Sequence, residues 1–339
     1  MGGHDTVTGV NNIQYTAQFG NGVSGTIGLD DPTVFNRTVV GNLSVGLPAA
    51  GTGAPTNTYG GTHAPDIVGN IRVDQAWGLF QISGAAHLVN ASYNSVNVGG
   101  APNNFSEISG HPDSKWGGSE MAALQIKNIP TGAGDDFKID VSYAKGDTKN
   151  VISTSGASPS FAMFGGTGRP GAYQSLGFGQ TADAVFLPGF LTGGLTGDIK
   201  LVDACGVRGA YNHNWDPYWS SSLWGSYAGV RYGGNAFDIG TAKGQFCASF
   251  NAGRAPGTLS ADYSCNPDYN IAQVGVVTRW TPVKNLTFSA EVGAFFLDQQ
   301  FTGAAALPVG APKPTGPTVF YEFKDQSTVF LNVRAQRNF

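Results

Sequence analysis

The last thirteen residues, Ser327-Thr-Val-Phe-Leu-Asn-Val-Arg-Ala-Gln-Arg-Asn-Phe339, decide the fold class of this chain. Read with a period of two, Val329, Leu331 and Val333 fall on one face, and mostly polar side chains fall on the other. A strand of about ten residues with one apolar face and one polar face, ended by an aromatic residue, has the dimensions of a membrane-spanning β-strand. A half-buried strand of a soluble sandwich would show the same alternation. The fold class therefore depends on whether the pattern repeats.

The alternation repeats along the whole chain. Strands are predicted at 12–19, 23–29, 67–73, 80–89, 116–129, 137–143, 199–214, 223–232, 269–280 and 286–297, before the last one at 327–339. For 223–232, either face could be the apolar one. Short turns alternate with long loops rich in Gly, Thr and Asn, and we expect 147–196 to be one such loop, with room for its own hairpin. Short turns at one end and long loops at the other are typical of an outer-membrane β-barrel.

Composition favours the same fold class. Charged residues make up 12% of the chain, against roughly 25% in soluble domains. The chain holds 50 glycines, about twice the usual share. It contains no run of 18 apolar residues and no long segment with a helical apolar stripe, so helices are not expected to span a membrane. The net charge of −4 and the scattered Lys and Arg give no reason to expect a nucleic-acid partner.

Motifs for catalysis and cofactors are weak. The stretch Gly166-Thr-Gly-Arg-Pro-Gly171 matches a dinucleotide-binding pattern, but Pro170 would disturb the turn that this pattern requires. The histidines lack metal-ligand spacing, and His213-Asn-Trp-Asp216 has no accompanying nucleophile elbow. We therefore expect no enzyme activity, no cofactor and no metal.

The three cysteines allow two interpretations. Cys247 and Cys265 enclose a loop and could form a disulfide in an oxidising compartment, which would leave Cys205 as a small apolar residue inside a strand. Alternatively, all three could be free.

Charged side chains on the polar faces of the predicted strands are candidates for a pore lining, because a charge on the lipid face costs about 2 to 4 kcal/mol at mid-bilayer. The candidates are Arg72, Lys127, Lys138, Asp140, Lys200, Arg208, Arg279, Glu291 and Arg334. Tryptophans at strand ends and in turns are candidates for an aromatic girdle at the membrane interface: Trp77, Trp116, Trp215, Trp219 and Trp280.

Several stretches, in order along nearly the whole chain, resemble the alphaproteobacterial general porins, which are trimeric outer-membrane diffusion channels. They are Asp5-Thr-Val-Thr-Gly-Val-Asn-Asn-Ile-Gln-Tyr-Thr-Ala-Gln-Phe-Gly-Asn-Gly22, Arg72-Val-Asp-Gln-Ala-Trp-Gly78, Tyr143-Ala-Lys-Gly146, Asn212-His-Asn-Trp-Asp-Pro-Tyr-Trp219, Trp280-Thr-Pro-Val-Lys-Asn-Leu286 and Val333-Arg-Ala-Gln-Arg-Asn-Phe339.

The resemblance implies an all-β fold, a transmembrane antiparallel β-barrel of the 16-stranded porin type. About eleven strands of it are expected here, in one domain over 1–339. It implies that 1–10 is the tail of the constriction loop, that 11–339 holds the strands and loops, and that Phe339 is the C-terminal assembly signal. It further implies a homotrimer in the bacterial outer membrane, in contact with lipid and lipopolysaccharide, that admits small hydrophilic solutes. An odd strand count and the lack of a signal peptide lead us to expect a chain truncated at its N-terminus.

Two other classes of protein fit parts of the pattern. An outer-membrane adhesin or translocator domain would also carry long Asn-, Thr- and Gly-rich loops. A soluble, lectin-like β-sandwich would share the alternation of single strands. Channel conductance separates a porin from the first class, and dependence on detergent for solubility separates it from the second.

Overall fold

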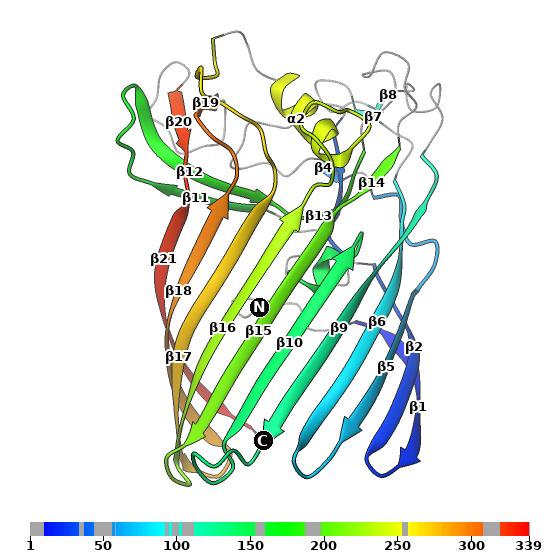
Figure 1. Ribbon diagram of the computed structural model, residues 1–339, viewed down its shortest axis with the longest axis vertical. Coiled ribbons are helices and arrows are strands. Elements are labelled where there is room, and N and C mark those ends of the chain that lie inside the picture. Colours follow the sequence, from blue (N-terminus) through cyan, green and yellow to red (C-terminus); the bar gives the residue numbers. More distant parts are fainter. Residues whose placement is uncertain are drawn as a thin grey trace.

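The computed structural model describes residues 10–33, 37–43, 56–57, 59–91, 95–96, 102–103, 112–152, 160–186, 198–252, 257–307 and 319–338. Its main element is an antiparallel sheet of eleven strands (Figure 1). The strands are β1 (Asn12–Gly20), β2 (Val23–Asp30), β5 (Asp66–Asp74), β6 (Gly78–Val89), β9 (Lys115–Lys127), β10 (Asp136–Lys145), β15 (Asp203–Asn214), β16 (Trp219–Arg231), β17 (Tyr269–Val283), β18 (Leu286–Gln299) and β21 (Gln326–Arg337). The predicted all-β fold and its eleven wall strands are confirmed.

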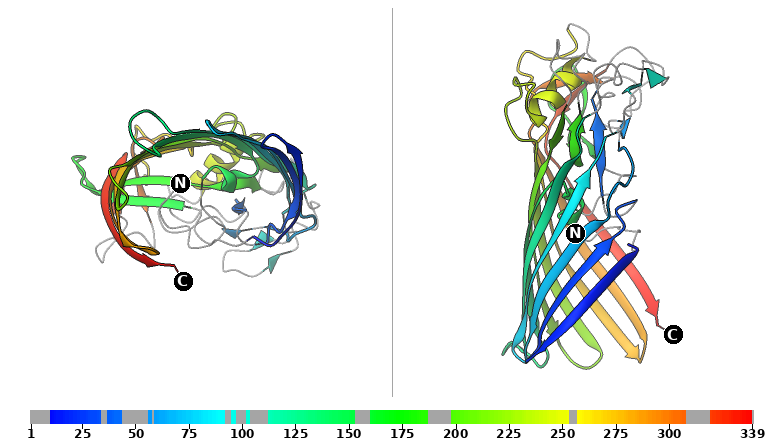
Figure 2. Two further views of the ribbon diagram at one scale, coloured as in Figure 1. Left: turned by 90° about the horizontal axis from the view of Figure 1, so that it is seen from below. Right: turned by 90° about the vertical axis from the view of Figure 1, so that its right-hand side faces the viewer.

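Each strand of this sheet pairs with its neighbours in chain order, from β1 to β21, and these two strands lie at the two edges. The sheet curves into a wall with a convex and a concave face (Figure 2). Short turns join the strands at one end, and long connections join them at the other (Figure 1). We call the end with the long connections the mouth.

The first short turn shows how local sequence fixes the register. Asn21 and Gly22 connect β1 to β2 with positive φ angles of 51° and 73°. Such a two-residue turn matches the twist of the strands that it joins, and it favours Asn-Gly. A Cβ atom at Gly22 would lie 1.9 Å from the carbonyl oxygen of Asp74, so only glycine fits there. Ile27 then pairs with Tyr15, which places two apolar side chains on one face.

The convex face is mostly apolar from one edge of the sheet to the other. Registered pairs such as Ile71 with Ile82 and Val292 with Leu331 repeat this arrangement from strand to strand, and all four side chains are exposed. The face of β16, which the sequence left open, follows from the same register. Leu223 pairs with Val276 on the convex face, and Trp224 therefore projects from the concave face.

The long connections form smaller elements at the mouth. They are β3 (Val39–Asn42), β4 (Thr56–Asn57), β7 (Ser95–Val96), β8 (Pro102–Asn103), η1 (Thr148–Asn150), β11 (Ser160–Gly165), β12 (Ala172–Gln180), β13 (Ala182–Phe186), β14 (Ile199–Leu201), α2 (Ala242–Ala252), β19 (Ala304–Leu307) and β20 (Val319–Phe323). A hydrophobic core that includes Leu176, Phe246 and Phe301 lies at this end and packs against wall residues such as Val230 and Tyr269.

Two features differ from the sequence prediction. The predicted strand 199–214 is two strands, because Val202 is fully buried and its backbone bonds to Gly146 and Asp183 instead of continuing one ladder. The cysteine loop, where no helix was expected, contains the eleven-residue helix α2. Its apolar stripe consists of little more than Phe246 and Phe250, which is too short to stand out in the sequence. Among the described residues, no helix has the length and apolar character needed to cross a membrane.

Candidate functional site

The concave face carries the predicted charged residues of the wall. Strand alternation and register place eight of the nine candidates there: Arg72, Lys127, Lys138, Asp140, Arg208, Arg279, Glu291 and Arg334. Lys200 is the exception. It lies in β14 of a mouth sheet, where its Nζ atom is 3.0 Å from the carboxylate of Asp198.

Oppositely charged side chains lie next to one another on this face. Arg208 on β15 and Asp140 on β10 are cross-strand partners, with Arg208 Nε 2.9 Å from Oδ1 and 3.2 Å from Oδ2 of the carboxylate. Asp74 binds Arg72 at 2.8 Å and Lys127 at 2.6 Å. Ion pairs this exposed contribute at most about 1 kcal/mol to stability. Their main effect is on the electric field along the face.

A second charged region lies on β17, β18 and β21, toward the short turns. Arg279, Ser289 and Arg334 occupy one row across these strands. Arg279 donates a hydrogen bond of 2.6 Å to the hydroxyl of Ser222. Glu291 accepts one of 3.2 Å from Asn332 in the adjacent row.

Strands β12 and β13 cross the concave side near the mouth, and the green strands of this region lie inside the curved wall (Figure 2). Gln326 of β21 donates a hydrogen bond to Ser175, and Tyr232, just beyond β16, donates one of 2.7 Å to the carbonyl of Gln180. All residues from 175 to 186 are buried. We call 175–186 the inner segment; it narrows the space beside β16 to β21.

The sequence pattern predicts an external loop for the inner segment, and the structure instead buries it inside the wall. The sequence does carry one signal for buried strands here, which is a nearly continuous run of small and apolar residues. A strand that is covered on both faces has such a run in place of alternation.

Buried acids anchor the inner segment to the wall. Asp183 accepts hydrogen bonds from the backbone N–H groups of Thr38 and Thr148, both at 2.7 Å. On the neighbouring wall strands, His87 Nδ1 lies 2.7 Å from Asp66 Oδ1, and both side chains are buried. These residues join β3, η1, β13 and the wall into one polar network.

Asp147, next to η1, belongs to the same network. It accepts hydrogen bonds from Ser119 at 2.6 Å and from Asn150 at 2.7 Å, and its other carboxylate oxygen has no partner. Burial and the nearby Asp183 raise the pKa of Asp147 to about 7. Part of this network therefore changes charge near neutral pH.

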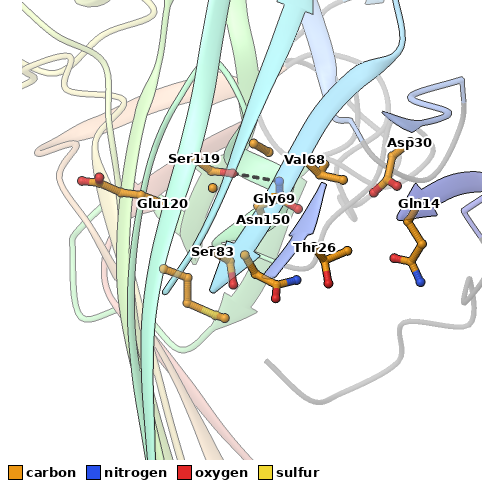
Figure 3. A pocket seen from close by; sticks show the side chains of 13 residues that line it. Gln14, Thr26, Asp30, Val68, Gly69, Ser83, Ser119, Glu120 and Asn150 are labelled. Carbon is orange, nitrogen blue, oxygen red and sulfur yellow. Dashed lines mark hydrogen bonds between the residues drawn. The ribbon is translucent and has the colours of Figure 1, made fainter. Parts of the chain in front are cut away.

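A pocket of about 250 Å³ opens on the concave side of β1 to β9 (Figure 3). Its lining is mostly uncharged and polar, with Gln14, Thr26, Asn70 and Ser83 from four neighbouring strands. Glu120 points to the opposite side of the wall (Figure 3). The concave face therefore combines neutral polar stretches with charged ones.

The five predicted girdle tryptophans are all exposed by 40% or more. Trp77, Trp215, Trp219 and Trp280 lie at the short-turn end, and Trp219 and Trp280 stack with ring centroids 5.8 Å apart. Trp116 is the second residue of β9 and lies at the mouth end. Phe339 lies outside the described residues, as do residues 1–9 of the expected constriction loop.

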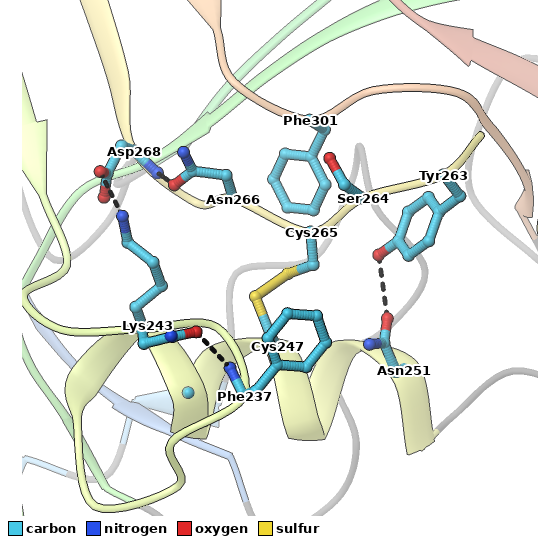
Figure 4. The surroundings of a disulfide bond; sticks show 12 residues. Phe237, Lys243, Cys247, Asn251, Tyr263, Ser264, Cys265, Asn266, Asp268 and Phe301 are labelled. Atoms are coloured by element: carbon cyan, nitrogen blue, oxygen red, sulfur yellow. Dashed lines mark hydrogen bonds and ion pairs between the residues drawn. A yellow bond between two sulfur atoms is a disulfide. The ribbon is translucent and has the colours of Figure 1, made fainter.

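A disulfide joins Cys247 of α2 to Cys265 in the connection before β17 (Figure 4). The two Cα atoms are 5.7 Å apart. Lys243 pairs with Asp268 at 2.6 Å beside it. Cys205 is free and exposed on the convex face of β15.

A sheet with an apolar convex face and a charged concave face, with short turns at one end and long connections at the other, defines the class of β-stranded outer-membrane proteins. The model of a family described as the porin subfamily matches residues 1–331. The chain belongs to this family, and the family places it in the outer membrane.

Among solved structures, the chain is similar to the outer membrane channel DcaP of Acinetobacter baumannii, with 13% identity and a TM-score of 0.46. That match covers 96% of this chain and 62% of DcaP. The chain therefore spans less than two thirds of the DcaP chain. LpxR from Salmonella typhimurium matches with 8% identity and a TM-score of 0.28, over 97% of this chain and 88% of that chain. No curated protein matches the sequence.

Proposed function

We propose that this chain forms the wall of a water-filled porin channel, through which small hydrophilic solutes and ions diffuse passively across the outer membrane. The observation that carries this proposal is the division of the sheet into two faces. The convex face presents apolar side chains suited to lipid, and the concave face presents paired charges and neutral polar groups suited to water.

The charged residues of the concave face set the selectivity in this proposal. Arg72, Lys127, Lys138, Asp140, Arg208, Arg279, Glu291 and Arg334 line the pore, with Lys200 at its mouth. The convex face contacts lipid and lipopolysaccharide, the tryptophans lie at the two interfaces, and the channels associate as homotrimers. The partly exposed ion pairs support this role, because charges in a water-filled pore act on passing ions.

Reconstitution in planar lipid bilayers tests the proposal. Protein purified from outer membranes should produce stepwise, ohmic conductance that increases in proportion to salt concentration. A chain that inserts, as shown by protection of the convex face from a water-soluble label at Cys205, but gives no steps would be an adhesin or translocator wall and not a porin.

A further inference from the structure

Two aromatic side chains share one row of the concave face on β16 to β21. Trp224 on β16, Gly275 on β17, Gly293 on β18 and Phe330 on β21 form one continuous row across four neighbouring strands. The register places all four on the concave face. The two rings are separated only by glycines.

Each ring lies over a glycine of the adjacent strand. A Cβ atom at Gly275 would be 2.6 Å from Cζ2 of Trp224, and one at Gly293 would be 2.5 Å from Cζ of Phe330. The ring centroids are 6.4 Å apart and the planes differ by 28°. Because the glycines belong to adjacent strands, the rings lie side by side against the wall. They form a nearly flat apolar surface, which we call the aromatic shelf.

The rows beside the shelf supply hydrogen-bonding groups. The row toward the mouth contains Ser226, Gln273, Phe295 and Thr328. The row toward the short turns contains Ser222, Val277, Glu291 and Asn332. The indole N–H of Trp224, the hydroxyl of Ser226 and the amide oxygen of Gln273 are buried and have no hydrogen-bond partner, so they do not face the open side of the shelf. The hydrogen-bonding groups of these rows that a solute can reach are the exposed side chains of Thr328 and Asn332 and the half-buried carboxylate of Glu291.

The position of the shelf suits a passing solute. The inner segment contacts the wall at Leu297, where Gly177 packs, and this contact lies two rows toward the mouth from the shelf. A solute that passes the inner segment from the mouth reaches the shelf next.

We propose that the aromatic shelf is a subsite for the pyranose rings of neutral sugars, an inference that rests on the channel function proposed above. The apolar face of a pyranose stacks on the rings of Trp224 and Phe330, and its hydroxyls donate to the carboxylate of Glu291 and to the amide oxygen of Asn332. Glu291 is the one charged residue in the shelf row and the two rows beside it on β16 to β21. A neutral ring with hydroxyls matches both the shelf and its surroundings.

Maltotriose block of the ionic current tests this proposal. With wild-type channels in planar bilayers, maltotriose added to the bath should reduce the current in a saturable way. Phe330→Leu and Trp224→Leu keep apolar bulk but remove the flat rings. Each should raise the half-blocking concentration about two- to tenfold, the range that aromatic stacking energies give. Phe330→Tyr should restore wild-type block.

Tyr227→Leu is the matched control. Tyr227 is an aromatic residue of β16, the strand of Trp224, but it lies on the convex face. It should leave the block unchanged. The shelf proposal would be overturned if maltotriose blocked wild type, Phe330→Leu and Trp224→Leu at the same concentration. It would also be overturned if benzoate blocked the wild-type current and maltotriose did not.

Maltotriose titration of the protein in detergent micelles, followed by tryptophan fluorescence, separates failure of the shelf from failure of the channel. The wild-type signal should change saturably, and the change should be lost in Trp224→Phe. If no conductance appears but this signal does, the channel proposal fails and the shelf stands. If the wild-type signal does not change, the shelf is overturned.

Discussion

Replacing Arg208 with glutamate should make the channel more selective for cations. Arg208 lies on the concave face and pairs with Asp140, and 38% of its side chain is exposed. The substitution removes one positive charge and adds one negative charge, and it leaves Asp140 without its partner. The wall therefore changes by two charge units at a single position.

The size of the effect follows from Coulomb's law. At about 8 Å from a passing ion, two charge units alter its energy by about 1 kcal/mol in water, and screening at 0.1 M salt reduces this to about 0.5 kcal/mol. Because the change has opposite signs for cations and anions, the local ratio of cations to anions rises about fivefold. At 1 M salt the Debye length is about 3 Å, and the effect falls below about 1.5-fold.

The reversal potential under a tenfold KCl gradient, 0.1 M against 0.01 M, measures this change. We expect it to shift by about 10 to 30 mV toward the cation equilibrium potential. The charge-swapped variant Asp140→Lys with Arg208→Glu should return the potential to near wild type. Lys145→Glu is the matched control, because this substitution makes the same charge change at a residue on the convex face. An unchanged potential for Arg208→Glu, or an equal shift for Lys145→Glu, would refute the assignment of Arg208 to the pore.

Three other predictions concern the mouth and the wall. The raised pKa of Asp147 stabilises its protonated form in the folded mouth, so this contribution to stability is present below about pH 4 and is lost as pH rises through about 7. After division by the intrinsic, base-catalysed exchange rate, the protection factors of the neighbouring backbone amides should therefore fall from pH 5 to pH 8, and Asp147→Asn should flatten that dependence; an equally steep profile would contradict the assignment. Replacing Cys247 and Cys265 with serine removes a cross-link across 18 residues, which should lower the stability of the mouth by about 3 kcal/mol in protease-protection assays and leave the wall strands protected. On β10, Val141→Arg should cost about 2 to 4 kcal/mol in folding into lipid vesicles and Ser142→Arg much less, because Val141 lies on the convex face and Ser142 on the concave one; equal costs would contradict the orientation of the sheet.

Alternation predicted the wall well because each wall strand has different solvents on its two faces. Val329, Leu331 and Val333 are exposed on the convex face, while Phe330 between them lies on the concave side. Phe330 interrupts the polar face in the sequence, and that interruption turned out to be half of the aromatic shelf. The sequence could not show this, because its partner Trp224 lies more than a hundred residues earlier and the register of four strands brings the two together.

The mouth could not be predicted in the same way. Strands β12 and β13 are covered on both faces, so they have no alternation to detect. Their parallel partners, β20 and β3, come from distant connections, and only the folded wall brings these segments together. The prediction that Lys200 lies on the wall is wrong for a related reason. Nothing in the local sequence marks the end of β14 and the start of β15 on either side of Val202.

The parallel pairing of β12 with β20 and of β13 with β3 has a consequence for recognition of the mouth, which is the end that faces the cell exterior in outer-membrane barrels with long connections there. Three connections that are far apart in the sequence contribute to one structured body at the mouth. An antibody against the native mouth therefore binds a discontinuous epitope, and peptides copied from single connections should compete poorly for it. Sequence changes in one connection should also alter the epitopes presented by the others, so that few substitutions suffice to change how the surface is recognised.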